Sequence, residues 1–410
     1  MIELRTYAHV ERLQPCTTMD VTKLDFTFDK DAKADSGPPV RIAFLGTRHP
    51  HVLYRFTILD KMAGFEFVGM YEENQEIAEG FATRIPKLQR FHDPGALLRE
   101  APDVVMIHAL DPDTPRWARF VLDHAPSSLK ALFLEKPGAA DPKDFVALAE
   151  EIEARRPKLA VELGYELHYA ESLAFARKVV REGVLGDITT ARFHGGCPSG
   201  AGMDLWQSIP EDLGGIMQTE GCHTLENVLD LFGPPQSILS SIRKLPKKPP
   251  HPIVGWIPHV FAGTVADTEF SIGSLLYEDI ASAILEYPDK NVIMDLTAWE
   301  PTEWCHEWAI DVYGTNGSLH VNPDPATGQL FLREARASFP AGRTEMKSTL
   351  PVGQSGIVDC YRRQFETLFR RAGGLPAEDG DCGLGTATDI MRVIGSAYVS
   401  GREGRKVDIV

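Results

Sequence analysis

The tripeptide Glu135-Lys136-Pro137 carries the most informative pair of ionisable side chains in the sequence. It ends a short apolar run, ALFLEKP, which has the composition of a buried parallel strand. Ligands of doubly wound parallel sheets bind beyond the carboxyl ends of the strands, so we expect Glu135 and Lys136 to face a bound cofactor. Taken alone, the tripeptide is better explained as a surface Glu-Lys pair that begins a loop.

A histidine lies near the start of a second segment with chemical potential, LGGIMQTEGCHTLENVLDLFG (213–233). A Gly-Gly pair leads into a helical pattern, and Thr219 and His223 share one face if both are helical, because they are four residues apart. A histidine there can exchange a proton with a substrate hydroxyl. Without further information, a helix-capping or buried structural histidine is the preferred interpretation.

The turn after the first expected strand, VRIAFLG (40–46), keeps part of a dinucleotide-binding pattern. In that pattern three glycines make the tight turn, admit the pyrophosphate and pack the helix on the sheet. Here only the first glycine is present, while an arginine and a histidine stand at the second and third positions. The residues of this turn that we expect to contact the cofactor are Gly46, Thr47, Arg48, His49 and His51.

Glu72 ends the second expected strand, at the place where this pattern carries an acidic residue. A carboxylate there binds both ribose hydroxyls of the adenosine and repels a 2′-phosphate, which favours NAD over NADP. Two alternatives stay open. Glu72 and Glu73 begin a helix, where acidic residues suit the positive end of the dipole, or Arg48 reaches a 2′-phosphate.

Three histidines are expected to meet near the same cleft. His49 and His51 follow the first strand, and His108 lies near the end of the strand in DVVMIHAL. Those two strands are neighbours in a Rossmann order, and imidazole suits zinc and similar ions. No acidic partner stands at matching spacing, so we expect hydrogen bonds to phosphate or substrate and no metal.

The chain alternates strands with helices in its first part and changes character later. Apolar runs near residues 40, 65, 103, 131 and 158 alternate with helical patterns, which predicts a doubly wound parallel sheet. Later strands follow one another with hairpin signals such as TNGS, which predicts a large, mostly antiparallel open sheet in an α+β region. The expected divisions are an extension over 1–38, a Rossmann domain over 39–164 and a substrate and oligomerisation domain over 165–410.

Net charge, apolar stretches and cysteine spacing disfavour several classes of protein and partner. The formal net charge of -16 disfavours nucleic acid and anionic membranes as partners. No apolar stretch is long enough to span a membrane, and the N-terminus lacks the apolar region of a signal peptide. The 6 cysteines are scattered without metal-ligand spacing, which favours reduced thiols in a cytoplasmic protein.

Several of these segments, in this order, resemble the Gfo/Idh/MocA oxidoreductases over roughly residues 40–410. The resemblance rests on the strand-ending EKP, GYELHYAESLAFARKVVREGVLGDITTARF, the GG…TEGCH…LFGPP segment, YGTNGSL and AYVSGREGRKVDI. It implies bound NAD(P), a sugar, polyol or cyclitol substrate, and dimers or tetramers packed through the open sheet.

The resemblance also implies roles for individual residues. Lys136 and His223 match the lysine of EKP and the histidine of a DxGxH motif, both of which act near the reacting carbon. We expect Lys136 to take the alcohol proton, with a pKa lowered by desolvation or nearby cations, and His223 to share or relay it. Thr219 joins them as the third catalytic candidate. The substrate-binding candidates are Tyr165, His168, Trp206 and Glu220.

Three departures from the family pattern keep other functions open. Thr219 replaces the aspartate of DxGxH, the glycine-rich turn is reduced to GTRHPH, and His168 stands where relatives often carry arginine. One alternative is an NAD-dependent glycosidase or lyase that oxidises its substrate only transiently. The other is a dinucleotide-binding sensor without catalysis, which the retention of both Lys136 and His223 disfavours.

Overall fold

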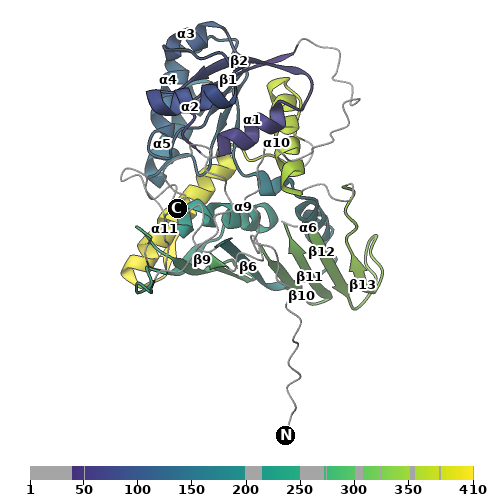
Figure 1. The fold of residues 1–410 in the computed structure, drawn as a ribbon. Coiled ribbons are helices and arrows are strands. Elements are labelled where there is room, and N and C mark those ends of the chain that lie inside the picture. The colour runs from purple at the N-terminus through teal and green to yellow at the C-terminus, as the bar shows by residue number, and fades with distance from the viewer. Residues whose placement is uncertain are drawn as a thin grey trace, which may run out of the picture.

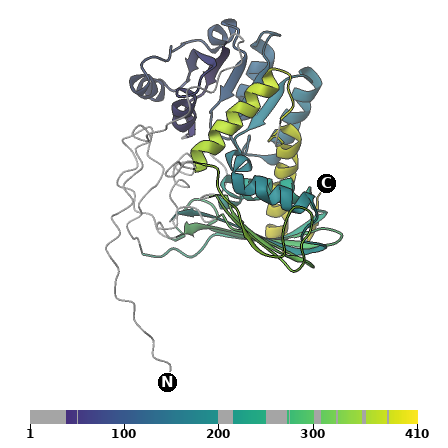
Figure 2. The same cartoon turned by 90° about the vertical axis from the view of Figure 1, so that its right-hand side faces the viewer.

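The computed structural model describes residues 39–49, 51–198, 215–249, 272–273, 275–300, 308–323, 326–350, 356–377 and 380–409. Two sheets dominate this part of the chain, and helices lie between and around them (Figures 1 and 2). No helix of these residues is long and apolar enough to cross a membrane.

The first sheet has five parallel strands in the order β2-β1-β3-β4-β5. β3 and β4 consist entirely of buried residues, as expected of strands covered on both faces. This arrangement confirms the predicted doubly wound parallel sheet and the predicted pairing of β1 with β3. The strands are β1 (Val40–Leu45), β2 (Phe65–Tyr71), β3 (Val104–Ile107), β4 (Ala131–Leu134) and β5 (Ala160–Leu163).

Helices connect these strands, and several begin at side-chain caps. Asn74, Asp93 and Asp141 each accept a hydrogen bond from a backbone N–H of the helix that follows. Two of these caps precede a proline in the first helical turn, where its missing N–H costs nothing. The helices are α1 (His51–Leu59), α2 (Gln75–Arg84), α3 (Pro94–Arg99), α4 (Thr114–His124) and α5 (Pro142–Arg155).

The second sheet has nine strands in the order β13-β12-β11-β10-β6-β9-β8-β7-β14, and only β6 and β9 pair in parallel. A two-residue turn at Thr315 and Asn316 joins β10 to β11, as the Asn-Gly signal predicts. The predicted antiparallel sheet is therefore confirmed. The strands are β6 (Ile188–Pro198), β7 (Ser237–Arg243), β8 (Ile280–Glu286), β9 (Asn291–Glu300), β10 (Ile310–Gly314), β11 (Gly317–Asn322), β12 (Thr327–Leu332), β13 (Gly342–Glu345) and β14 (Val407–Asp408).

Two late helices join the sheets. α10 (Gly356–Ala372) returns to the first sheet and packs against α1, β4 and β5. α11 (Leu384–Glu403) contacts α5 on one side and α9 and β7 on the other, so it bridges the two sheets (Figure 1). The remaining helices are η2 (Glu166–Tyr169), α6 (Glu171–Arg181), α8 (Ile216–Thr219) and α9 (Gly221–Phe232).

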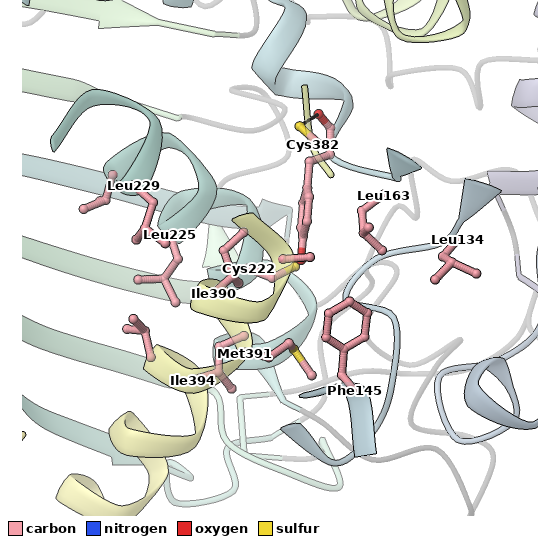
Figure 3. Close-up of a cluster of buried hydrophobic side chains, with 14 of the residues drawn as sticks. Leu134, Phe145, Leu163, Cys222, Leu225, Leu229, Cys382, Ile390, Met391 and Ile394 are labelled. Carbon is pink, nitrogen blue, oxygen red and sulfur yellow. Dashed lines mark hydrogen bonds between the residues drawn. The ribbon is translucent and has the colours of Figure 1, made fainter. Parts of the chain in front are cut away.

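One hydrophobic cluster extends from the first sheet to the second. Figure 3 shows Met391 and Ile394 of α11 near Phe145 on one side and near Leu225 of α9 on the other. Leu134 at the end of β4 belongs to the same cluster. Because this core is shared, the carboxyl edge of the first sheet is held firmly against the helices that cover the second sheet.

Candidate active site

The turn after β1 is tight and close to the neighbouring strand. Gly46 has φ +79°, and a Cβ atom there would lie 3.0 Å from the backbone nitrogen of Ala109. The amide of Gly46 donates to Tyr71 O over 2.8 Å, and that of His49 donates to His108 O over 2.9 Å. Only glycine suits this position, and α1 begins directly afterwards, so its N-terminal amides face the turn.

Glu72 is fixed against this turn at the end of β2. Its Oε2 accepts a hydrogen bond from the Thr47 amide over 2.7 Å, and its Oε1 accepts one from the Asn74 amide over 2.9 Å. Burial raises the pKa of Glu72, although both amides act to lower it. Arg48 lies 3.7 Å from Asp113, measured from Nη1 to Oδ2. A carboxylate is therefore fixed beside the turn after β1.

Four side chains surround the Glu135 carboxylate beyond the end of β4. Arg55 donates from Nε to Oε1 and, over 3.1 Å, from Nη2 to Oε2. The Nδ1 atoms of His51 and His49 lie 3.6 and 4.0 Å from Oε2. His108 Nε2 lies 3.4 Å from Oε1. All five side chains are buried, and we call them the Glu135 cluster. The three histidines meet as predicted, and Glu135 is the acidic partner that sequence spacing did not reveal.

Burial and the pairing of Glu135 with Arg55 set the charges in the Glu135 cluster. Burial alone would raise the pKa of Glu135, but the Arg55 guanidinium and the nearby imidazoles hold it well below its usual range. Burial lowers the pKa of His49 well below its ordinary value and that of His108 to about 3. Two neutral imidazoles thus face one ionised carboxylate that is paired with an arginine.

Arg55 also ties α10 and the chain after β5 to this cluster. Its Nη1 donates to Gln364 Oε1 over 2.9 Å, and its Nη2 lies 3.6 Å from Glu166 Oε2. The guanidinium carbon stands 4.6 Å from the ring centroid of Phe133 and 4.8 Å from that of Tyr361. A fully buried arginine is tolerable here because carboxylates, an amide and two aromatic faces replace its water.

Lys136 reaches from the end of β4 to the helices over the second sheet. Its Nζ donates to the carbonyl oxygen of Thr219 over 2.6 Å. Burial alone would lower the pKa of Lys136, but Glu220, Cys222 and Glu166 raise it above the ordinary value. The expectation of a lowered lysine pKa is therefore wrong, because carboxylates surround this ammonium.

His223 stands near Lys136 in the opposite charge state. Burial, followed by the Lys136 ammonium, lowers the pKa of His223 well below its ordinary value. Its ring meets those of Tyr165 and Trp308 edge to face, with centroids 5.7 Å apart in both pairs. Nδ1 of His223 and the hydroxyl of Tyr165 are buried without a hydrogen-bond partner among the described residues. These two atoms can therefore receive a polar ligand.

Thr219 contributes its backbone carbonyl to the site, and Glu220 contributes its carboxyl group. The Thr219 hydroxyl donates to Gly215 O over 2.8 Å, so the side chain bonds to its own helix while its carbonyl holds Lys136. Glu220 is buried, and burial raises its pKa while Lys136 lowers it. A backbone carbonyl and the neighbouring glutamate thus lie where the family motif carries an aspartate.

His168 lies in a second buried network. Its Nδ1 is 2.7 Å from Glu226 Oε1 and 4.0 Å from Asp230 Oδ2, while Arg177 donates to both His168 O and Asp230. Cys382 Sγ lies 3.8 Å from the same glutamate oxygen. We call these five residues the Glu226 cluster. Burial would lower the pKa of His168, but Glu226 raises it, so this histidine is held by an ion pair.

Several residues of the site have no clear signal in the sequence. Arg55 is one helical turn after His51, and this i, i+4 spacing is a signal that could have pointed to it. Gln364 and Tyr361 reach the site from α10, far away in the chain. Gly164 is required by close packing, because a Cβ there would lie 2.7 Å from Arg55 Nη2 and from Glu135 Oε2. The predicted ligand Trp206 lies outside the described residues.

Comparisons with known proteins show which proteins this chain resembles. Residues 173–320 match the model of the GFO/IDH/MocA C-terminal domain. An uncharacterized oxidoreductase of Schizosaccharomyces pombe is 21% identical over 409 residues, which cover 91% of this chain and 100% of the relative. Residues 173–320 thus resemble the C-terminal domain of the Gfo/Idh/MocA oxidoreductases, and the chain as a whole is similar to an oxidoreductase. The resemblance stated from sequence is thereby confirmed.

Solved structures with the same fold differ in what they do. Levoglucosan dehydrogenase, solved with NADH and L-sorbose, aligns with TM-score 0.72 and 14% identity over 91% of this chain and 100% of that one. The transcriptional regulator Gal80p of Kluyveromyces lactis aligns with TM-score 0.72 and 16% identity over 92% of this chain and 95% of that one. At this identity the likeness establishes the shared fold.

Proposed function

We propose that this protein is an NAD(P)-dependent oxidoreductase that acts on a secondary hydroxyl of a sugar, sugar derivative or cyclitol. The observation that carries the proposal is the hydrogen bond from Lys136 Nζ to Thr219 O. It joins the lysine at the carboxyl edge of the parallel sheet to the helices that carry His223, so both candidate groups border one site. The NADH and L-sorbose bound by levoglucosan dehydrogenase support the same class of cofactor and ligand.

The described residues fit a dinucleotide. The positive φ of Gly46 and its close packing against Ala109 keep the turn after β1 tight. The amides that begin α1 suit a pyrophosphate, and Glu72 suits the ribose hydroxyls. Since a carboxylate repels a 2′-phosphate, NAD is favoured over NADP. When bound, the nicotinamide accepts the hydride that leaves the alcohol carbon.

The chain's own groups would handle the proton. Lys136 is positively charged, so it donates a hydrogen bond to the substrate oxygen and stabilises the alkoxide as the hydroxyl proton leaves. His223 is neutral, and its Nδ1 lacks a partner in the described structure, so it can accept that proton. This division differs from the expectation that Lys136 is the base, because the ammonium is already stabilised by carboxylates.

Binding of the cofactor by the purified full chain tests the proposal. We expect nicotinamide in the protein as isolated, or titration with NAD to give one site per chain that binds more tightly than NADP. Failure of both dinucleotides to bind would contradict the proposal. Tighter binding of NADP would keep the class and reassign Arg48 as the residue that recognises the 2′-phosphate.

A second candidate is a dinucleotide-binding sensor without turnover. The likeness to Gal80p favours it, since that protein of the same fold is a transcriptional regulator. The buried Lys136 and His223, with opposite protonation preferences, favour the enzyme instead. Binding of NAD without any conversion across a broad sugar panel would support the sensor.

Self-association through the second sheet is part of the proposal. Figures 1 and 2 show the described helices α6, α9 and α11 on the side of this sheet that faces the first sheet. Five large apolar side chains on its strands are exposed by 38% to 50%, namely Leu239, Ile284, Ile293, Tyr313 and Phe331. Exposed apolar side chains of this kind suit a second copy of the chain.

A further inference from the structure

The Glu135 cluster has the donor set and the spacing of a transition-metal site. One donor atom each from His49, His51 and Glu135 lies within 4.8 Å of the other two. The two distances from histidine Nδ1 to Glu135 Oε2 are 3.6 and 4.0 Å. Ligands of tetrahedral zinc, at bond lengths of about 2.0–2.1 Å, stand about 3.3–3.4 Å apart. Both distances to Glu135 therefore exceed this spacing by well under an ångström.

The ring of His49 offers an unprotonated nitrogen near this point. The backbone amide of His51 donates to His49 Nδ1 over 3.2 Å, and a bound ion would take that lone pair in place of the amide. His108 lies on the other carboxylate oxygen, with its Nε2 3.4 Å from Glu135 Oε1.

Arg55 does not exclude a cation from this position. It uses one lone pair on each oxygen of Glu135, and each carboxylate oxygen has a second one. Glu166 Oε2 lies 3.6 Å from Arg55 Nη2 and balances part of the arginine charge. Held by Gln364 on its far side, Arg55 fixes the carboxylate in the way that outer-shell partners orient metal ligands.

We propose that His49, His51 and Glu135 bind a divalent transition-metal ion, best Zn²⁺. Imidazole and carboxylate donors suit zinc, and three protein ligands leave its fourth position to water or another small ligand. The ion would tie the turn after β1 to the end of β4. In this chain, which has lost two of the three glycines of that turn, the metal would hold the turn in place beside Lys136.

Cobalt binding tests this site without any assay of turnover. The full chain is stripped with a chelator, titrated with Co²⁺ and followed by visible absorption. We expect one equivalent, the intense ligand-field bands of four-coordinate Co²⁺, no thiolate-to-cobalt charge-transfer band, and displacement by Zn²⁺ with a rise in Tm. Absence of both the bands and the Zn²⁺-dependent rise in the wild-type protein would overturn the proposal.

Variants locate the ion. His49→Gln and His51→Gln are expected to weaken Co²⁺ binding at least about 100-fold, more than loss of an outer-shell partner does. His320 on β11 forms an exposed pair with Asp311 on β10. His320→Gln is therefore the matched control and should bind Co²⁺ as the wild type does. A thiolate charge-transfer band, or binding that survives both substitutions, would place the ion elsewhere, for example at His168, Glu226 and Cys382, and would overturn the assignment.

Discussion

The Glu135 cluster and the Glu226 cluster contain the same residue types, but the pKa values of His108 and His168 shift in opposite directions. Each buries a histidine, a glutamate and an arginine. In the first, Arg55 takes both oxygens of Glu135, and the pKa of His108 falls to about 3. In the second, Arg177 bonds to Asp230 and a backbone carbonyl, so Glu226 is left to His168, whose pKa rises.

Burial disfavours the imidazolium in both clusters, and the partner of the arginine decides whether the glutamate offsets this. Where the arginine pairs with the glutamate, His49 and His108 stay neutral. Where it pairs elsewhere, the histidine becomes the cation of an ion pair and acts as a structural link. The first cluster adjoins Lys136, and the second contacts the backbone of Tyr165 through Cys382.

Loss of Lys136 should have the largest effect on activity. Lys136→Ala is expected to lower kcat/KM by about 10²–10⁴-fold, because the hydrogen bond to the developing alkoxide is removed. NAD affinity should stay within a few-fold of the wild type. Lys130→Ala, before the opposite end of β4 and paired with Asp103, is the control and should leave kinetics unchanged. Unchanged turnover in Lys136→Ala would remove this lysine from the mechanism.

Removal of the arginine from the first cluster should have the largest effect on stability. Arg55→Met leaves the Glu135 carboxylate buried beside neutral imidazoles, which is expected to cost about 3–5 kcal/mol in the free energy of unfolding. Arg119→Met breaks a partly exposed pair with Glu151 and should cost about 1 kcal/mol or less. Urea denaturation at neutral pH measures both, and equal losses would refute the assigned role of Arg55.

The ion pair of the Glu226 cluster should make the free energy of unfolding depend on pH. The pKa of His168 is higher in the folded state, so its pair with Glu226 contributes fully below about pH 6.5 and loses its contribution as the pH rises through the folded value. We expect His168→Gln to cost about 1.5–3 kcal/mol near pH 6 and less near pH 9. Turnover per folded molecule should stay unchanged. A cost that grows with pH would contradict the ion pair.

The smallest change in stability is expected on the second sheet, away from both clusters. Ile293→Lys with Phe331→Lys should change the free energy of unfolding by about 0.5 kcal/mol or less per site, since both side chains are exposed. The same substitutions should abolish self-association measured by sedimentation. Leu375→Lys, equally exposed after α10, should leave it intact. A double variant that still associates would move the interface elsewhere.

Local sequence signals predicted the frame of the molecule well. The apolar run of β1, the helix of α1 and the Asn-Gly turn between β10 and β11 depend on neighbouring residues and appeared as expected. Short elements such as β14 and α3 were not predicted, because they contain too few residues for a hydrophobic periodicity to be recognised. The convergence of the three histidines was also predictable, since it follows from adjacent parallel strands.

Charge states in the site were not predictable in the same way. Glu135 lies 80 residues from Arg55, and Gln364 lies 309 residues from it, so no spacing in the chain announces their contact. The protonation of Lys136 depends on Glu220, at the junction of α8 and α9, and on Glu166 of η2. Titration follows from the set of buried neighbours, and that set is fixed by the tertiary fold.

The most direct test of the proposed function is whether reduced nicotinamide accumulates. The purified chain with excess NAD is mixed with a panel of sugars and cyclitols, and absorbance at the reduced-cofactor band is followed over time. Accumulation with at least one secondary alcohol, matched by an equal amount of ketone, is the predicted result. Conversion of sugar without net reduction of NAD would contradict the dehydrogenase and favour transient oxidation, and no conversion at all would favour the sensor.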